Sequence, residues 1–172
     1  MTDPSQPGPQ QAPLTGADPD QQGGPQLRAL SQFVKDLSFE NPGNPMAQGQ
    51  PNIDIGIDVQ ATPHRQGNGV YEVSLKLRAV AQIQDTTLFV LELDYGGLFQ
   101  IDGMNEAEAE PALLIECPRL LFPFARRLIA DITREGGFPP LLIDPVDFSA
   151  LYRNQKLSQS GQSGGEAPAQ QA

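Results

Sequence analysis

The stretch YEVSLKLRAVAQIQDTTLFVLELDY, residues 71–95, decides the fold. It holds two runs in which apolar and polar side chains alternate, which is the period-two pattern of a β-strand with one face in a core. The first run spans 71–83, and the second follows Gln84 and Asp85 and continues through 89–95. A connection this short predicts an antiparallel hairpin.

Two more strands are predicted before this hairpin. Residues 53–60 (IDIGIDVQ) alternate in the same way, and the TPHRQGNG that follows has the composition of a turn. Residues 33–40 predict a first strand, with Leu37 and Phe39 on its apolar side. Between these two strands, NPGNPMAQGQPN (41–52) contains three prolines and two glycines, so a long crossover is expected rather than a tight turn.

From Asn105 the apolar period becomes helical. Pro118 and Pro123 each remove a backbone donor, so we expect a helix pair or one kinked helix with a break near Cys117 and Pro118. Gly136 and Gly137 should end it, and Asp147 is a suitable N-cap for a last helix over 148–157. The predicted class is α+β, a four-stranded antiparallel sheet with the kinked long helix and the C-terminal helix packed on one face.

Composition separates the chain into three parts. Residues 1–26 and 158–172 are rich in Gln, Pro, Gly and Ser and nearly free of apolar side chains, so we expect disordered tails around one folded domain at 27–157. The net charge is −10, and the tails hold only four of the acidic residues, so the domain itself is acidic. Such a surface repels phosphate backbones and anionic lipid, which argues against nucleic-acid or membrane-surface binding.

The same sequence predicts a cytoplasmic location. Its start has no basic segment followed by an apolar run, and no apolar stretch is long enough to cross a bilayer. The single cysteine, Cys117, allows no intrachain disulfide and no cysteine-based zinc site, and it is interpreted as a small buried hydrophobe.

Few residues could carry catalysis. His64, the only histidine, lies in a predicted turn and is interpreted as solvated. The glycines at 67–69 and 96–97 lack the context of a phosphate-binding loop and are interpreted as turn residues. Acid-base or metal chemistry would require Asp54 with Asp58, or Glu92 with Asp94, to converge in a cleft. We therefore predict no catalytic residues, no metal and no cofactor, and expect a protein that is not an enzyme.

One face of the predicted sheet is apolar and the other is acidic. The acidic face carries Asp54, Asp58, Glu72, Glu92 and Asp94 against Lys76 and Arg78. Leu88 and Val90 interrupt it. They are either the centre of a protein contact or ordinary hydrophobes that are exposed or partly covered.

Five strings closely resemble the SecB family of export chaperones: VKDLSFENP (34–42), YEVSLKLRAVA (71–81), FVLELDYGGLFQI (89–101), CPRLLFPFAR (117–126) and GGFPPLLIDPVDFSALY (136–152). They occur in the family's order and spacing. The resemblance implies a dimer formed by joined sheets and a homotetramer, a dimer of dimers, formed through the helices. It also implies ATP-independent binding of unfolded preproteins and their delivery to SecA.

The resemblance further implies two sets of site residues. Groove residues for unfolded clients would be Met46, Ile53, Ile55, Phe148, Leu151 and Tyr152. Residues for SecA docking would be Asp36, Glu40, Val90 and Glu92, facing the C-terminal zinc module of SecA, to which the zinc belongs. Two alternatives stay open: a holdase of the same fold, either a general adaptor or one linked to an antitoxin, whose client is not exported, and a small enzyme or ligand-binding β domain with a deep polar pocket.

Overall fold

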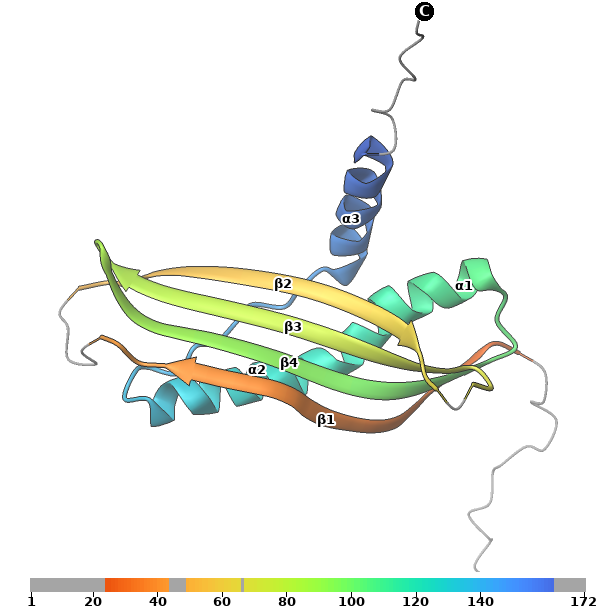
Figure 1. Ribbon diagram of the computed structural model, residues 1–172, viewed down its shortest axis with the longest axis horizontal. Coiled ribbons are helices and arrows are strands. Elements are labelled where there is room, and N and C mark those ends of the chain that lie inside the picture. Colours follow the sequence, from red (N-terminus) through yellow and green to blue (C-terminus); the bar gives the residue numbers. More distant parts are fainter. Residues whose placement is uncertain (1–23, 44–48, 66, 163–172) are drawn as a thin grey trace, which may run out of the picture.

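The computed structural model describes residues 24–43, 49–65 and 67–162, with side chains described as far as 158. Four strands, β1 (Gln26–Glu40), β2 (Asn52–Pro63), β3 (Val70–Ile83) and β4 (Thr86–Asp102), form one antiparallel sheet (Figure 1). The spatial order is β1-β4-β3-β2. The predicted four-stranded antiparallel sheet is confirmed, and the strands are longer than the alternating runs alone indicated.

The two edge strands are consecutive in the sequence. Because β1 and β2 lie at opposite edges of the sheet, a tight turn cannot join them, as expected for a long crossover. Gly43 is fixed at the start of this crossover, where its N–H donates to the Leu88 carbonyl over 3.3 Å. Met46, expected in the crossover, lies outside the described residues.

Bulges interrupt the regular alternation of the strands. Ala81 pairs with Phe89 but Gln82 pairs with Thr87, so Leu88 is an extra residue in β4. Leu88 is 4% exposed, so of the two interpretations of this position the covered one holds, and Leu88 is not an exposed hydrophobe of the acidic face. On β1, the register shifts at Leu30 and at Lys35 in the same way.

The interpretation of Gly96 and Gly97 as turn residues is wrong, because both lie inside β4. Close approaches from both faces of the sheet explain why glycine occurs here. A Cβ at Gly96 would lie 2.8 Å from Cδ of Lys35, and one at Gly97 would lie 2.9 Å from Cδ2 of Leu121. Glycine therefore lets β1 and α2 pack against the centre of the sheet.

The long helical segment changes its pitch where a break was predicted. It comprises α1 (Glu106–Pro111), the π-helical segment η1 (Ala112–Glu116) and α2 (Cys117–Glu135). The N–H of Cys117 bonds to the carbonyl of Ala112, five residues back, and Pro118 then stands in the first turn of α2. The chain thus stays helical, and the irregularity takes the form of a π-bulge.

Helix α2 ends next to Gly136 and Gly137, as predicted. Gly137 has a φ of 87°, its N–H bonds to the Arg134 carbonyl, and the N–H of Phe138 bonds to the Thr133 carbonyl over 3.1 Å. This is a Schellman arrangement, which favours glycine at the left-handed position.

The core lies between α2 and the apolar face of the sheet. Buried side chains of α2 meet those of β3 and β4; the fully buried set includes Val73, Leu75, Leu77, Leu91, Leu93, Phe99, Leu121 and Ile129. Cys117 is 0% exposed in this core, which confirms the interpretation of a small buried hydrophobe. Burial raises the pKa of its thiol to about 12.

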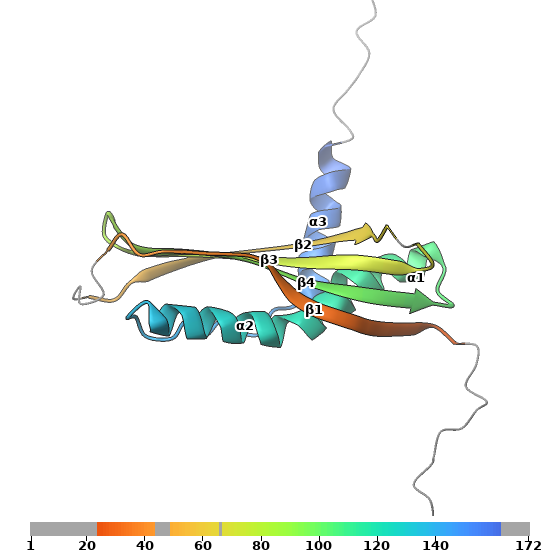
Figure 2. The ribbon, with the colours of Figure 1, turned by 60° about the horizontal axis from the view of Figure 1, so that its bottom comes forward.

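The last helix, α3 (Phe148–Gln162), packs into the core at its start and runs past the predicted end at 157. Asp147 caps it as predicted, accepting the N–H of Ala150 at Oδ1 over 3.0 Å. Phe148 packs edge-on against Phe122, with ring centroids 5.9 Å apart. Figures 1 and 2 show that α3 then rises past the β2 edge while α2 stays on the other side of the sheet.

Candidate protein-binding surfaces

The four predicted docking residues share the polar face of the sheet. Strand register places Asp36 opposite Asp94, Ser38 opposite Glu92 and Glu40 opposite Val90. Directly opposed residues of antiparallel strands have their side chains on the same face. The structure therefore brings Asp36, Glu40, Val90 and Glu92 together on neighbouring strands, with Val90 half-buried and the three carboxylates exposed.

Most other carboxylates of this face are already bound within the protein. Oε1 of Glu72 lies 2.5 Å from Nζ of Lys35, and Asp94 accepts a hydrogen bond from the Ser74 hydroxyl. Asp58 accepts from the amides of Gln60 and Gln155, over 2.9 and 3.2 Å. These contacts reduce the ability of the three carboxylates to attract an external cation.

Glu92 is held differently. Its Oε1 lies 3.0 Å from Nε of Arg78, its direct neighbour on β3, and both side chains are about half exposed. A pair this open to water is weak, about 0 to 1 kcal/mol. A hollow of about 540 Å³ lies over this part of the face, lined by Asp36, Gly56, Asp58, Lys76, Arg78, Glu92 and Asp94 together with the strand residues between them.

Lys35 is a neighbour of the predicted docking residues that sequence reasoning missed. Regular alternation places it on the apolar side of β1, but the bulge between Val34 and Asp36 turns it to the polar face. There it pairs with Glu72, and this hydrogen bond, with the nearby charge of Asp94, raises the pKa of Lys35. A register shift within a strand leaves no signal in the alternation, so only the pairing pattern could reveal it.

The opposite face of the sheet is incompletely covered. Helix α2 packs on β4, β3 and β1, whereas β2 contacts the helical layer through η1. Ile53 and Ile55, at the start of β2, therefore remain 38% and 36% exposed although they point to the apolar side. Two exposed isoleucines in alternate positions form a short apolar strip.

A small apolar recess continues this strip. It has a volume of about 120 Å³ and is lined by Pro51, Ile53, Leu88, Phe89, Phe138, Pro139, Pro140 and Leu141. Sequence reasoning included only Ile53 of this set. Pro51 directly precedes β2, and the other members come from the bulge in β4 and from the chain after α2, which meet β2 only through the tertiary fold.

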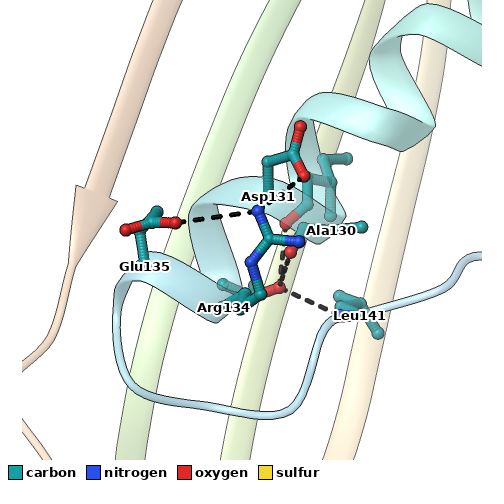
Figure 3. Close-up of polar contacts among 7 residues, drawn as sticks. Ala130, Asp131, Arg134, Glu135 and Leu141 are labelled. Atoms are coloured by element: carbon teal, nitrogen blue, oxygen red, sulfur yellow. Dashed lines mark hydrogen bonds and ion pairs between the residues drawn. The ribbon is translucent and has the colours of Figure 1, made fainter.

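The chain after α2 is fixed by buried polar contacts. Thr133 is 0% exposed, and its hydroxyl accepts the N–H of Leu141 over 2.9 Å while it lies 2.9 Å from the Ile129 carbonyl. Figure 3 shows Leu141 beside the last turn of α2, where Arg134 pairs with Asp131. Nε of Arg126 donates to the Ile143 carbonyl over 2.5 Å. These bonds hold one wall of the recess in place.

A second groove, of about 990 Å³, runs between the far half of β2, α1 and α3. Leu151 lines it, and Nζ of Lys156 on α3 pairs with Glu110 on α1 over 2.6 Å. Tyr152 is half-buried, with Nζ of Lys156 at 5.7 Å from the centre of its ring. Of the predicted client residues, Ile53 lines the recess and Leu151 lines this groove, so these two belong to separate hollows.

One predicted client residue needs correction. Phe148 is 1% exposed and belongs to the core, because the first turn of α3 is packed against Phe122. Its ring cannot reach a client while α3 stays in this position.

Among the described residues, no group of three or more His, Cys, Asp or Glu side chains is arranged to hold a metal ion. Within the same ranges, none of the helices has the length and apolar character needed to span a membrane. The fold and the surfaces above define an α+β binding protein. It has an open acidic sheet face on one side and uncovered apolar side chains on the other.

The chain belongs to the SecB family, since the family model described as "Preprotein translocase subunit SecB" matches residues 20–159. A protein-export protein SecB of Hyphomonas neptunium is 70% identical over 131 residues, which cover 76% of this chain and 79% of that protein. The protein-export protein SecB of Maricaulis maris is 55% identical over 148 residues, covering 84% and 85%. The recognised resemblance is thereby confirmed.

A solved structure supports the fold independently. The SecB-like chaperone of Mycobacterium tuberculosis, in complex with a peptide from an antitoxin, superposes with a TM-score of 0.61. The match covers 70% of this chain and 90% of that one at 14% sequence identity.

Proposed function

We propose that this protein is an ATP-independent, non-enzymatic chaperone that holds unfolded preproteins in the cytoplasm and delivers them to SecA for export. Membership of the SecB family and the high identity to protein-export proteins support this role. The single observation that carries it is the difference between the two faces of the sheet. Ile53 and Ile55 face one side of the sheet, and the carboxylates of Asp36, Glu40 and Glu92 face the other.

Client holding is assigned to the apolar surfaces. Micromolar affinity requires about 8 kcal/mol, and complete burial of a large apolar side chain contributes roughly 1.5 to 3 kcal/mol. Several shallow contacts along the isoleucine strip, the recess and the groove beside Leu151 therefore suffice. Folded proteins have buried such side chains, so binding favours unfolded chains. Met46 in the crossover and Tyr152 on α3 are proposed as additional contacts.

SecA docking is assigned to the acidic sheet face. Asp36, Glu40 and Glu92 would attract a cationic surface, and Val90 would add an apolar contact between them. The proposed partner is the small C-terminal zinc module of SecA, which carries its own metal. Because this face lies opposite the isoleucine strip, client and SecA could bind at the same time.

A homotetramer, a dimer of dimers, is proposed from the remaining exposed apolar groups. The edge strand β1 exposes Leu30, Val34 and Leu37, which a second sheet could cover. Helix α2 exposes Leu120 and Phe124 on the side away from its own sheet. Native mass spectrometry would measure the number of subunits directly.

Three experiments test the proposal. Purified protein should slow the aggregation of an unfolded precursor without ATP, and Glu92→Lys should weaken binding to the SecA module while client holding survives. Failure to hold any unfolded chain would remove the chaperone assignment. Loss of client binding with unchanged affinity for SecA would remove the docking assignment. Co-purification of envelope precursors would distinguish an export chaperone from a holdase with another client.

A further inference from the structure

The acidic face contains an ion pair between Arg78 and Glu92 that the proposed function does not explain. Arg78 is paired with one of the carboxylates assigned to docking, because its Nε lies 3.0 Å from Oε1 of Glu92. A cationic partner must therefore compete with Arg78 for that oxygen, or bind at Oε2 beside the guanidinium and against its repulsion.

The surroundings allow Arg78 to move aside. Gly56 is its direct neighbour on β2, and a Cβ built there would have only Cβ of Arg78 within 4 Å, at 3.9 Å. The space over Gly56 is thus open and forms part of the hollow. Asp54 and Asp58 stand on either side of Gly56 on the same face, so a displaced guanidinium would find new acidic neighbours.

The other cations of this face are placed differently. Lys35 is bound to Glu72, away from Glu92. Lys76 is paired in register with Asp58 and Asp94, two residues from Arg78 on the same strand and face. Among the described side chains, Arg78 is the cation that forms an ion pair with one of the proposed docking carboxylates.

We propose that Arg78 is an internal competitor for Glu92 that weakens the binding of a cationic partner and so favours its release. This inference rests on the proposed docking of SecA to the acidic face. Arg78 would lower the apparent affinity for the partner, because only the molecules in which Glu92 is not paired with Arg78 bind the partner at full strength. An exposed pair of this kind accounts for about a two- to fivefold change in affinity.

The test compares two neutral substitutions on one strand. Arg78→Gln and Lys76→Gln each remove one positive charge from the same face, but only the first frees Glu92. Binding of the zinc-loaded C-terminal module of SecA would be measured by calorimetry at low and high salt. We expect Arg78→Gln to tighten binding about two- to fivefold more than Lys76→Gln does.

A double-mutant cycle isolates the pair. In the Glu92→Gln background, Arg78→Gln should lose its advantage over Lys76→Gln, because no carboxylate remains to be freed. The inference is overturned if the two neutral substitutions act equally, or if Arg78→Gln weakens binding, while Glu92→Gln still impairs docking. If Asp36→Asn and Glu92→Gln both leave the affinity unchanged, the docking proposal fails, and this inference fails with it.

Discussion

The hydroxyl of Thr133, whose side chain is buried in the core, accepts the N–H of Leu141 over 2.9 Å, and this bond helps to connect α2 to the chain that leads to α3. Leu141 lines the apolar recess, so the bond also fixes one wall of a proposed client surface. Leaving such a donor without an acceptor costs free energy, so loss of this bond should destabilise the folded protein as well as the recess.

Thr133→Val should therefore destabilise the protein by about 1 to 3 kcal/mol, since it keeps the shape but leaves the Leu141 N–H unpaired. Urea unfolding at fixed protein concentration measures the free energy, and hydrogen exchange measures protection of the Leu141 amide. Thr133→Ser is the matched control, because it keeps the hydroxyl. Equal exchange rates at Leu141 in the two variants would contradict the role of this bond.

Gly97→Ala should destabilise the protein by about 1 to 3 kcal/mol, because its Cβ would lie 2.7 Å from Cε2 of Phe99 and 2.9 Å from Cδ2 of Leu121. Gly56→Ala is the control within the same sheet, since its nearest neighbour would be 3.9 Å away. The midpoint of urea unfolding should fall for the first variant only. A similar fall for both would show that strand glycines are sensitive here for a reason other than packing.

The Cys117 thiol should be inert in the folded protein at about pH 8, because burial raises its pKa to about 12. The folded pKa lies above the unfolded value of about 8.5. This group's contribution to stability is therefore complete below about pH 8.5 and is lost as the pH rises towards 12. Alkylation by iodoacetamide, followed by mass spectrometry, should be rapid only in denaturing urea. Rapid labelling under native conditions would mean that η1 and α2 open around Cys117.

Ile53→Gln and Ile55→Gln should each weaken the binding of an unfolded precursor about three- to fivefold, because a client can cover only the part of each side chain that is still exposed. Unfolding in urea should change little. Phe148→Ala is the contrasting variant and should cost about 3 to 5 kcal/mol of stability, since its ring is fully buried. Unchanged client affinity in the double isoleucine variant would exclude the strip from the client site.

Much of the fold follows from local sequence. Alternation over 53–60, 71–83 and 89–95 predicted strands β2, β3 and β4. Asp147 predicted the start of α3, and Gly137 predicted the end of α2. These signals are local because strand alternation and helix caps depend on neighbouring residues along the chain. The common face of Asp36, Glu40, Val90 and Glu92 followed in the same way.

Only the tertiary structure decided which of these residues are available. Bulges at Lys35 and Leu88 moved one side chain to the polar face and buried the other, and packing against Phe122 removed Phe148 from the surface. The pairing of Glu92 with Arg78 joins residues from two strands, and alternation along one strand cannot predict it. The sequence by itself determined the strands, the helices and the faces of the sheet. Exposure and pairing depend on contacts between distant segments, which form only when the sheet and α2 pack together.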